Sequence, residues 1–374
     1  MSQLARDHAP ILWLHENEVF FPVDVQAAIE HSDLLRKGKP AGQVPDLEAL
    51  GQIKKSEETE LKLRKLNNHD FNGPSFDGLS GPSAIKAQAR RLYGRCLPAH
   101  GAQTDVLNQV KCYARVSEVR LKPRGHPIVD RRLKKFDPQI FGRYDLIEYF
   151  FYFVYNDGWN QHQGDWDCQI YLYIRRGDGR MFMVNRLHHD DWATVVSAGP
   201  PARIRDWVDG WNTRAKHEVG QAYALNGHPF VFVAQGGHGG YPTPGATAHG
   251  LKVKPVGQVL LNTDDRQIAR NCILPDGASD EELRALLAAS DISDQQLVTG
   301  RWTAPELVLE KNPTQPWLRY KGRWGQNSKY LGHAGPKRPP ITKKPVKQML
   351  RDSLWKVLAE GYSAGAPLDS WHGV

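Results

Sequence analysis

The sequence has few cysteines, and none of them forms a metal-binding or redox pair. The four cysteines are far apart and make no C-x-x-C motif: Cys96, Cys112, Cys168 and Cys272. This spacing argues against a zinc knuckle and against a dense disulfide framework. It favours reduced thiols that serve as small apolar side chains.

Long apolar runs are also missing. No segment approaches the roughly 18 apolar residues that a membrane-spanning helix needs. Residues 1–10 are polar and lack the apolar stretch of a secretory signal. We therefore expect no classical signal peptide. The protein would be cytoplasmic or exported by a signal-independent route, and peripheral where it works at a membrane.

Several familiar catalytic and nucleotide-binding motifs are absent. The chain contains no G-x-G-x-x-G or Walker A loop, no G-x-S-x-G elbow and no H-E-x-x-H motif. These absences make nucleotide-binding α/β folds, α/β-hydrolases and zinc peptidases of the usual types poor candidates.

Acidic residues are missing from one long segment. Between Lys311 and Arg351 there are eleven Lys or Arg and no Asp or Glu, whereas the whole chain has a net charge of +8. Such a segment attracts phosphate-bearing partners, either an anionic lipid surface or nucleic acid. Aromatic residues are interleaved with the cations, as in single-strand binders: Trp317, Tyr320, Trp324 and Tyr330. The alternative is a solvated basic surface that packs back on the body of the protein.

Apolar and alternating segments predict a mainly β protein. Strands are expected at 112–121, 147–156, 167–176, 181–187, 192–199, 229–235 and 256–262. The apolar run 147–156 is typical of a strand buried on both faces. The turn G-D-G between 167–176 and 181–187 indicates a hairpin. Helices are expected at 45–66, 84–95, 202–216, 279–289 and 345–360.

We expect these strands to form an antiparallel β-sandwich decorated with peripheral helices. The sandwich domain would cover residues 1–310, with helical insertions at about 40–110 and 200–220. A basic Trp- and Pro-rich C-terminal arm, residues 311–374, would pack on the domain or extend from it.

The densest group of polar residues lies in 155–173. Asp157 follows the first strand and His162 lies on the next loop. Asp165 and Asp167 open the second strand, where residues two apart share one face. Three carboxylates and one imidazole suit Mg²⁺, Ca²⁺ or Mn²⁺, whereas the lack of a thiolate argues against structural zinc. The alternative is that these residues form turns and an ion pair.

Two other groups contain histidine. In G-G-H-G-G-Y-P, residues 236–242, glycines on both sides of His238 permit close backbone approach to a ligand, or simply make a turn. Residues 187–192 hold two histidines and two aspartates in succession, which predicts a solvated hairpin loop. Cys168 adjoins this chemistry, so a Cys–His nucleophile is conceivable, although its side chain should face away from that of Asp167.

Four segments carry motifs of a known family: 5–25, 147–173, 228–245 and 322–340. They hold an apolar strand followed by acidic and aromatic residues and Pro, then H-Q-G-D-W-D, then G-G-H-G-G-Y-P, and finally G-R-W-G and G-P-K-R-P-P. In this order they resemble the Vps62-related family (vacuolar protein sorting-associated protein 62 and its relatives). The family name comes from a trafficking phenotype and implies no chemistry.

The central motif is also similar to the H-R-H-D-W-E region of necrosis- and ethylene-inducing peptide 1-like proteins, which are microbial β-sandwich cytolysins. In that family an Asp, a His, a second Asp and a Glu bind a divalent cation that engages a sphingolipid headgroup. The resemblance places Asp157, His162 and Asp165 in the first three positions. Asp167 stands in place of the Glu, one methylene shorter, so it would act through water. His238 resembles a further histidine near that site.

These observations lead to a primary functional expectation. We expect divalent-cation-dependent binding of polar lipid or glycan headgroups at membranes, as a microbial toxin or effector would use. The cation would be held by Asp157, His162, Asp165 and Asp167. The segment 311–351 would attract an anionic membrane.

Two alternatives stay open at this point. A metal-dependent hydrolase of a phosphodiester or ester would use the same site, with His238 or His162 as general acid or base. A nucleic-acid-binding protein would use the basic arm, and its affinity would fall steeply with salt. The sequence does not decide whether the protein is an enzyme.

Overall fold

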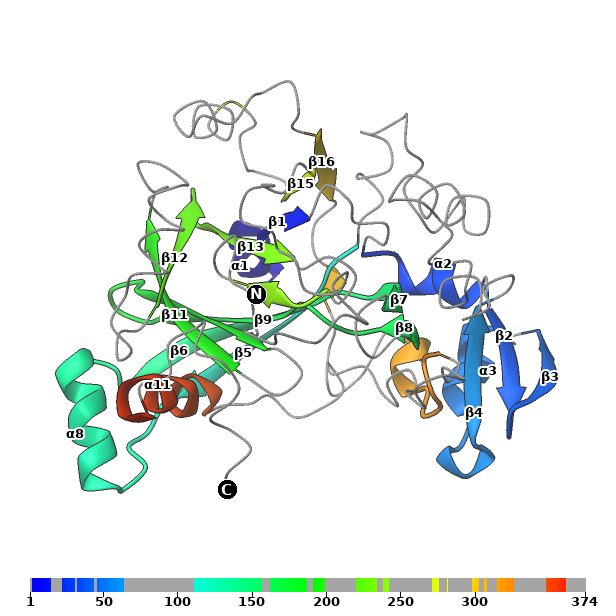
Figure 1. Ribbon diagram of the computed structural model, residues 1–374, viewed down its shortest axis with the longest axis horizontal. Helices are drawn as coiled ribbons and strands as arrows, with labels where there is room; N and C mark the ends of the chain where they lie inside the picture. The colour runs from blue at the N-terminus through cyan, green and yellow to red at the C-terminus, as the bar shows by residue number, and fades with distance from the viewer. Residues whose placement is uncertain are drawn as a thin grey trace, which may run out of the picture.

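Strand residues outnumber helical residues in the described chain, and the strands form one large sheet and two small ones (Figure 1). The computed structural model describes residues 2–14, 22–30, 32–43, 46–63, 111–156, 162–186, 191–198, 220–233, 238–241, 271–275, 281, 298–302, 306–307, 315–325 and 348–360. The expected mainly β fold with peripheral helices is confirmed. Among these residues, no helix is long and apolar enough to cross a membrane.

The large sheet has 12 strands in the order β16-β15-β1-β13-β12-β11-β10-β9-β6-β5-β17, with β14 also paired to β13. Its strands are β1 (Ile11–Leu14), β5 (Tyr113–Arg120), β6 (Arg143–Phe150), β9 (Gln169–Arg175), β10 (Met181–Arg186), β11 (Asp191–Ala198), β12 (Gly220–Leu225), β13 (His228–Val233), β14 (Gly240–Tyr241), β15 (Asn271–Pro275), β16 (Val298–Trp302) and β17 (Glu306–Leu307). It is a single curled sheet. The sheet is mixed because four of its strand pairs are parallel: β1–β13, β11–β12, β15–β16 and β17–β5.

The middle of the sheet is antiparallel, through β5, β6, β9, β10 and β11. The expected hairpin is present as β9–β10, with Met181 opposite Ile174. Gly177 and Gly179 in its turn have φ of +115° and +69°, backbone angles that favour glycine. The predicted strands at 112–121, 192–199 and 229–235 are confirmed as β5, β11 and β13.

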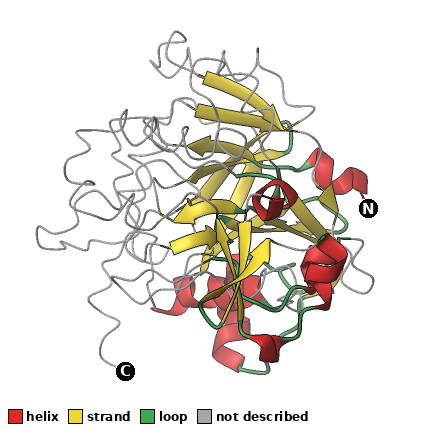
Figure 2. Ribbon diagram, turned by 90° about the vertical axis from the view of Figure 1, so that its right-hand side faces the viewer, coloured by secondary structure: helices red, strands yellow, loops and turns green. Residues whose placement is uncertain are grey.

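Both faces of the middle of the large sheet are buried, which explains the apolar runs of its strands. One face, with Ile147, Leu172 and Met183, packs beneath helix α1 (Ser2–Asp7). The other face packs against helices α8 (Pro127–Phe136) and α11 (Met349–Glu360). Figure 2 shows the strands through the centre of the molecule and the helices at its periphery. The predicted late helix is therefore confirmed as α11.

Two expectations about elements were wrong. The run 147–156 does not form one strand: β6 ends at Phe150, and a separate strand, β7, covers Phe153–Asn156. The segment 45–66 is not one helix. It forms α3 (Leu47–Gln52), the 3₁₀ turn η1 (Lys55–Glu57) and strand β4 (Thr59–Leu63). The predicted elements at 84–95, 202–216 and 256–262 lie outside the described residues, as does all of 279–289 except Glu281.

A three-stranded sheet lies beside the large one, in the order β3-β2-β4. Its other strands are β2 (Ser32–Arg36) and β3 (Lys39–Gln43), and helix α2 (Val25–Glu30) contacts β2 and β4. The segment 315–325, which includes the 3₁₀ turn η3 (Pro316–Arg319), packs against α3. Backbone hydrogen bonds also join Arg323 to Thr59 and Leu61 of β4. This part of the basic segment is thus built into the fold.

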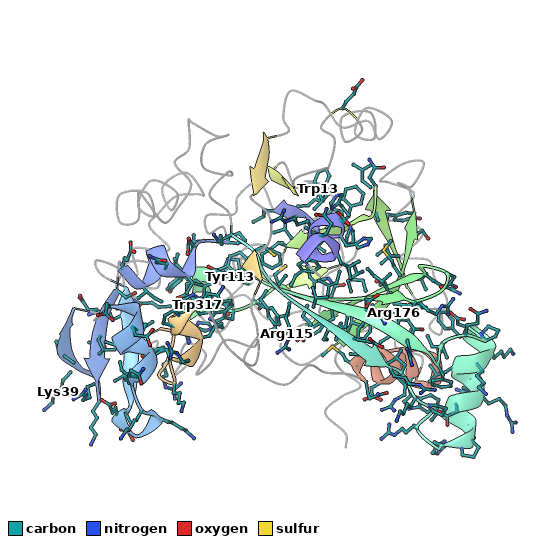
Figure 3. The ribbon with its side chains drawn as sticks, turned by 180° about the vertical axis from the view of Figure 1, so that it is seen from behind. Trp13, Lys39, Tyr113, Arg115, Arg176 and Trp317 are labelled. Atoms are coloured by element: carbon teal, nitrogen blue, oxygen red, sulfur yellow. The ribbon has the colours of Figure 1, made fainter. Side chains whose placement is uncertain are left out.

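An aromatic cluster joins the two sheets. Trp166 stacks on Trp317 with ring centroids 5.7 Å apart, and Trp324 meets Trp166 edge-on at 5.6 Å. Tyr113 of β5 contacts both Trp166 and Trp317 (Figure 3). Aromatic side chains bury large apolar areas, so this cluster fixes the segment 315–325 against the large sheet.

Two glycines allow the strand β8 (His162–Asp165) to touch the segment 315–325 through backbone atoms. A Cβ atom on Gly164 would overlap the carbonyl oxygen of Trp324, and one on Gly325 would overlap that of Gln163. Gly164 also has a φ of +65°. The polar motif H-Q-G-D therefore needs its glycine for close approach as well as for backbone conformation.

We predict that Gly164→Ala destabilises the protein far more than Gly38→Ala does. Gly38 has a similar φ of +73°, but a Cβ atom there would have no other atom within 4 Å, so both variants share the backbone strain of about 1–2 kcal/mol. Only Gly164→Ala adds steric overlap, which costs roughly 1–3 kcal/mol more. Urea unfolding of both variants measures the difference. Equal losses of unfolding free energy in the two variants would show that the overlap with Trp324 adds no destabilisation at position 164.

Candidate functional site

The candidate site is built on a small antiparallel pair of strands, β7 (Phe153–Asn156) and β8. Their register places Phe153 opposite Asp165 and Asn156 opposite His162. The pair lies between the large sheet and the three-stranded sheet (Figure 1). Asp157 follows Asn156 directly in the sequence but lies outside the described residues.

Asp165 is the charged centre of the site. It is 3% exposed, and its Oδ2 accepts a hydrogen bond of 2.8 Å from Nδ2 of Asn156. The Nδ1 atom of His238 lies 3.6 Å from the same oxygen. That distance is longer than a normal hydrogen bond, and the contact is ionic when the imidazole is protonated. Asp165 thus gathers polar groups from two separate parts of the chain.

His238 is held in an uncommon conformation. It is fully buried, its φ is +54°, and its ring stacks on that of Phe153 at 3.8 Å with an interplanar angle of 4°. A positive φ is uncommon for residues other than glycine, although histidine adopts it more often than most. The stacking and the ion pair fix the imidazole beside Asp165.

His162 and Asp167 are also buried but take different positions. The Nδ1 atom of His162 lies 3.3 Å from the carbonyl oxygen of Gln163. Asp167 lies beyond the end of β8, and its Oδ1 accepts a hydrogen bond of 2.8 Å from the backbone N–H of Cys168. The expectation that Asp165 and Asp167 share one face of a strand was wrong, because β8 ends at Asp165 and β9 begins at Gln169.

The surroundings of Asp165 keep its carboxylate ionised. Burial raises the pKa of Asp165, but the contact with His238, the charges of His162 and His238 and the hydrogen bond from Asn156 together lower this pKa below its ordinary value. A buried carboxylate that stays charged needs such partners, because an isolated buried charge is costly.

Cys168 is not an activated nucleophile. Burial, and then the charge of Asp167, raise the pKa of the Cys168 thiol well above its ordinary value. The reactive form of cysteine is the thiolate, so this thiol is inert at neutral pH. The Sγ atom of Cys168 lies on the inner side of the sheet, where it would be 2.9 Å from a Cβ atom on Gly240. The structure therefore gives no support to a Cys–His nucleophile.

Two amide side chains at this site stand out only in the structure. Asn156 lies in the polar segment 155–173, yet the sequence did not indicate that its side chain would donate to Asp165. Asn185 on β10 is fully buried, and neither of its amide atoms has a partner among the described residues. It lies near Gly240, and a single Asn within the apolar run M-F-M-V-N-R was the one sequence signal for it.

The site provides donors of the type that a hard cation prefers, but the described part does not complete a metal site. Carboxylate and imidazole groups suit Mg²⁺, Ca²⁺ or Mn²⁺. Asp165 uses Oδ2 for both Asn156 and His238, so its Oδ1 takes part in neither contact. Across the described ranges, no three His, Cys, Asp or Glu side chains form a group that could hold a metal ion. A cation held by Asp165 and His162 would need a further ligand.

No protein-family model matches the chain, and neither the curated proteins nor the solved structures provide a match.

We predict that Asp165→Asn lowers stability at neutral pH and that this loss shrinks in acid. Because the pKa of Asp165 is lowered by folding, its contribution is complete above the unfolded pKa of about 3.9 and is lost as pH falls through the folded-state value. At neutral pH, the loss should be on the order of 1–3 kcal/mol. Urea unfolding from neutral to acidic pH measures it. A loss that stays constant with pH would contradict the proposed ionised state.

Proposed function

We propose that the protein binds polar lipid or glycan headgroups at membranes with the help of a divalent cation at the Asp165 site. Asp165 and His162 would hold the cation, together with Asp157, and Asp167 would act through water. The bound cation would supply positive charge to a phosphate or sugar-acid headgroup.

The observation that carries this proposal is the buried, ionised carboxylate of Asp165. Buried charges in proteins are paired or coordinate metals. Two histidines and one amide already surround Asp165, and Oδ1 is the oxygen that neither Asn156 nor His238 contacts. The sequence neighbour of Asn156 is Asp157, a further carboxylate of the polar segment 155–173.

The contact between Asp165 and His238 favours a second candidate function, hydrolysis of a phosphodiester or ester. A buried aspartate that orients a histidine is the arrangement that many hydrolases use to fix a general base. In this alternative His238 would take a proton from water and Asp165 would stabilise the imidazolium. Binding and hydrolysis share these residues, and turnover separates them.

We predict that chelator-stripped protein binds one divalent cation and that Asp165→Asn abolishes this binding. The substitution keeps the shape of the side chain and removes its charge, which a hard cation requires. Calorimetric titration with Mg²⁺, Ca²⁺ and Mn²⁺ measures the affinity directly.

Asp46→Asn is the matched control for this titration. Asp46 caps α3 on the exposed surface, and asparagine is an equally good capping residue. The control should bind the cation as the native protein does. No heat with any ion, or equal affinity in Asp165→Asn, would remove the cation from the proposed function.

We predict that His238→Gln leaves vesicle binding intact if the protein is a binder, and lowers turnover by at least about a hundredfold if it is a hydrolase. Incubation with phospholipid vesicles and chromogenic phosphodiesters, followed by product analysis, separates the two. Product formed at equal rates by the native and His238→Gln proteins would exclude His238 as the base.

A further inference from the structure

Helix α8 exposes a face that combines several cations with one large apolar side chain. Val129 and Leu133 are buried on its opposite face. Residues spaced by three and four lie on one side of a helix, so Ile128, Arg131 and Lys135 share the exposed face. Ile128 is 58% exposed, and it is the one large hydrophobic side chain in the described part of the chain that is exposed.

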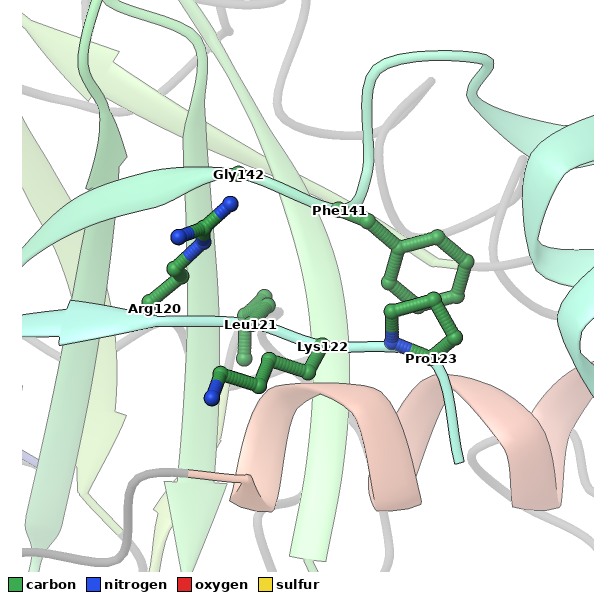
Figure 4. Close-up of a pocket in the computed structure, with 6 residues that line it drawn as sticks. All are labelled: Arg120, Leu121, Lys122, Pro123, Phe141 and Gly142. Atoms are coloured by element: carbon green, nitrogen blue, oxygen red, sulfur yellow. The ribbon is translucent and has the colours of Figure 1, made fainter. Parts of the chain in front are cut away.

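A pocket of about 450 Å³ lies at the base of this helix (Figure 4). It is lined by Arg120, Leu121, Lys122, Pro123, Phe141 and Gly142. Figure 4 shows the rings of Pro123 and Phe141 together at one side and the side chains of Arg120 and Lys122 at the other. The start of α11 borders it, since Arg351 donates to the carbonyl oxygen of Lys122. The pocket therefore adds two exposed cations next to α8.

This surface is strongly positive and is not neutralised within the described chain. From Arg120 to Phe136 the sequence has seven Lys or Arg and one acidic residue, Asp130. The Asp130 carboxylate accepts backbone hydrogen bonds from Arg124 and Gly125. No ion pair within the described ranges involves the side chain of Arg120, Lys122, Arg124, Arg131, Lys134 or Lys135.

Nearby arginines on the same sheet behave differently. Arg176 (labelled in Figure 3) pairs with Asp145 and Glu118. Arg180 pairs with Asp137. The nearby acidic side chains therefore form ion pairs with Arg176 and Arg180, and the cations around α8 are available to an external anion.

We propose that this α8 surface, residues 120–124 and the exposed face of 127–136, docks the protein on an anionic phospholipid bilayer. Clustered cations gain attraction from the negative surface potential of such a bilayer. An exposed apolar side chain in their midst enters the interface between headgroups and acyl chains, as in interfacial helices. A nucleic-acid backbone would use the cations but gain nothing from Ile128.

The proposal places the membrane contact on α8 and residues 120–124, which border the start of α11, and away from residues 315–325 of the C-terminal segment. It deepens the proposed membrane role, but it does not require the cation at Asp165. Trp317, Tyr320 and Trp324, the interleaved aromatics of that segment, are buried in the core. A nucleic-acid role for that segment would have to rely on its cations and on Tyr330, which lies outside the described residues.

The test is co-sedimentation with vesicles of phosphatidylcholine alone and of phosphatidylcholine with phosphatidylserine, in the presence of chelator. We expect the native protein to bind only the anionic vesicles, and to bind less in high salt. Arg131→Glu with Lys135→Glu should weaken binding at least about tenfold, and Arg120→Glu with Lys122→Glu should do the same. Ile128→Ser should weaken binding several-fold without changing the salt dependence.

The matched control is Lys39→Glu with Lys55→Glu. These two exposed lysines lie in and beside the three-stranded sheet, at the opposite end of the molecule from α8 (Figure 1). The control makes the same change in net charge and should bind as the native protein does. Thermal unfolding and circular dichroism should be unchanged in every variant, since all substituted side chains are exposed.

Three results would overturn the proposal. One is equal binding by the control and the α8 variants. Another is an unchanged affinity of Ile128→Ser together with stronger binding of single-stranded DNA than of vesicles, which would identify a polyanion site. The third is vesicle binding that requires added cation and is lost in Asp165→Asn, which would leave the proposed function standing and remove the α8 surface. Loss in the α8 variants alone, with chelator present, supports the surface independently of the cation site.

Discussion

One buried carboxylate, that of Asp165, brings together polar groups from three parts of the chain. Asp165 is at the end of β8, and its charge is stabilised by Asn156 from β7, by His162 from β8 and by His238 from a third part of the chain. Because an unpaired buried charge is costly, these segments must come together for the fold to form. The same requirement holds for the other buried ion pairs of the large sheet, Arg115 with Glu148 and Arg175 with Asp137.

Much of the local structure could be predicted from the sequence. Alternating and apolar runs predicted the positions of β5, β9, β10, β11 and β13. This works because successive side chains of a strand point to opposite faces of the sheet, so the sequence pattern reflects which faces are buried. The break between Phe150 and Phe153 had no local signal, since every residue there is apolar. The strand β4 was not predicted. Over only a few residues, the spacing of leucines such as Leu61 and Leu63 is compatible with a helix as well as with a short strand.

The candidate site could be predicted only in part, because its contacts are long-range. The motif analysis selected His162, Asp165, Asp167 and His238, and the structure brings Asp165 and His238 into contact. It could not show that Asp167 bonds to the backbone of Cys168, or that Gly164 touches the segment around Trp324. The contacts of Asp165 with His238 and of Gly164 with Trp324 join segments far apart in the chain, and no spacing rule encodes them. The basic segment was expected to be peripheral, yet its residues 315–325 supply core tryptophans.

We propose two separate roles for two parts of the protein. The Asp165 site recognises the headgroup, and the α8 surface attaches the protein electrostatically to the membrane. The central claim is that a divalent cation lies beside Asp165, and the most direct measurement is Mn²⁺ titration of histidine-labelled protein by nuclear magnetic resonance. The account predicts that the ring signals of His162 and His238 broaden first, whereas those of His8, His126 and His228 stay sharp. Assignments come from single His→Gln variants. Equal broadening of all histidines, or none at His162 and His238, would contradict a cation at this site.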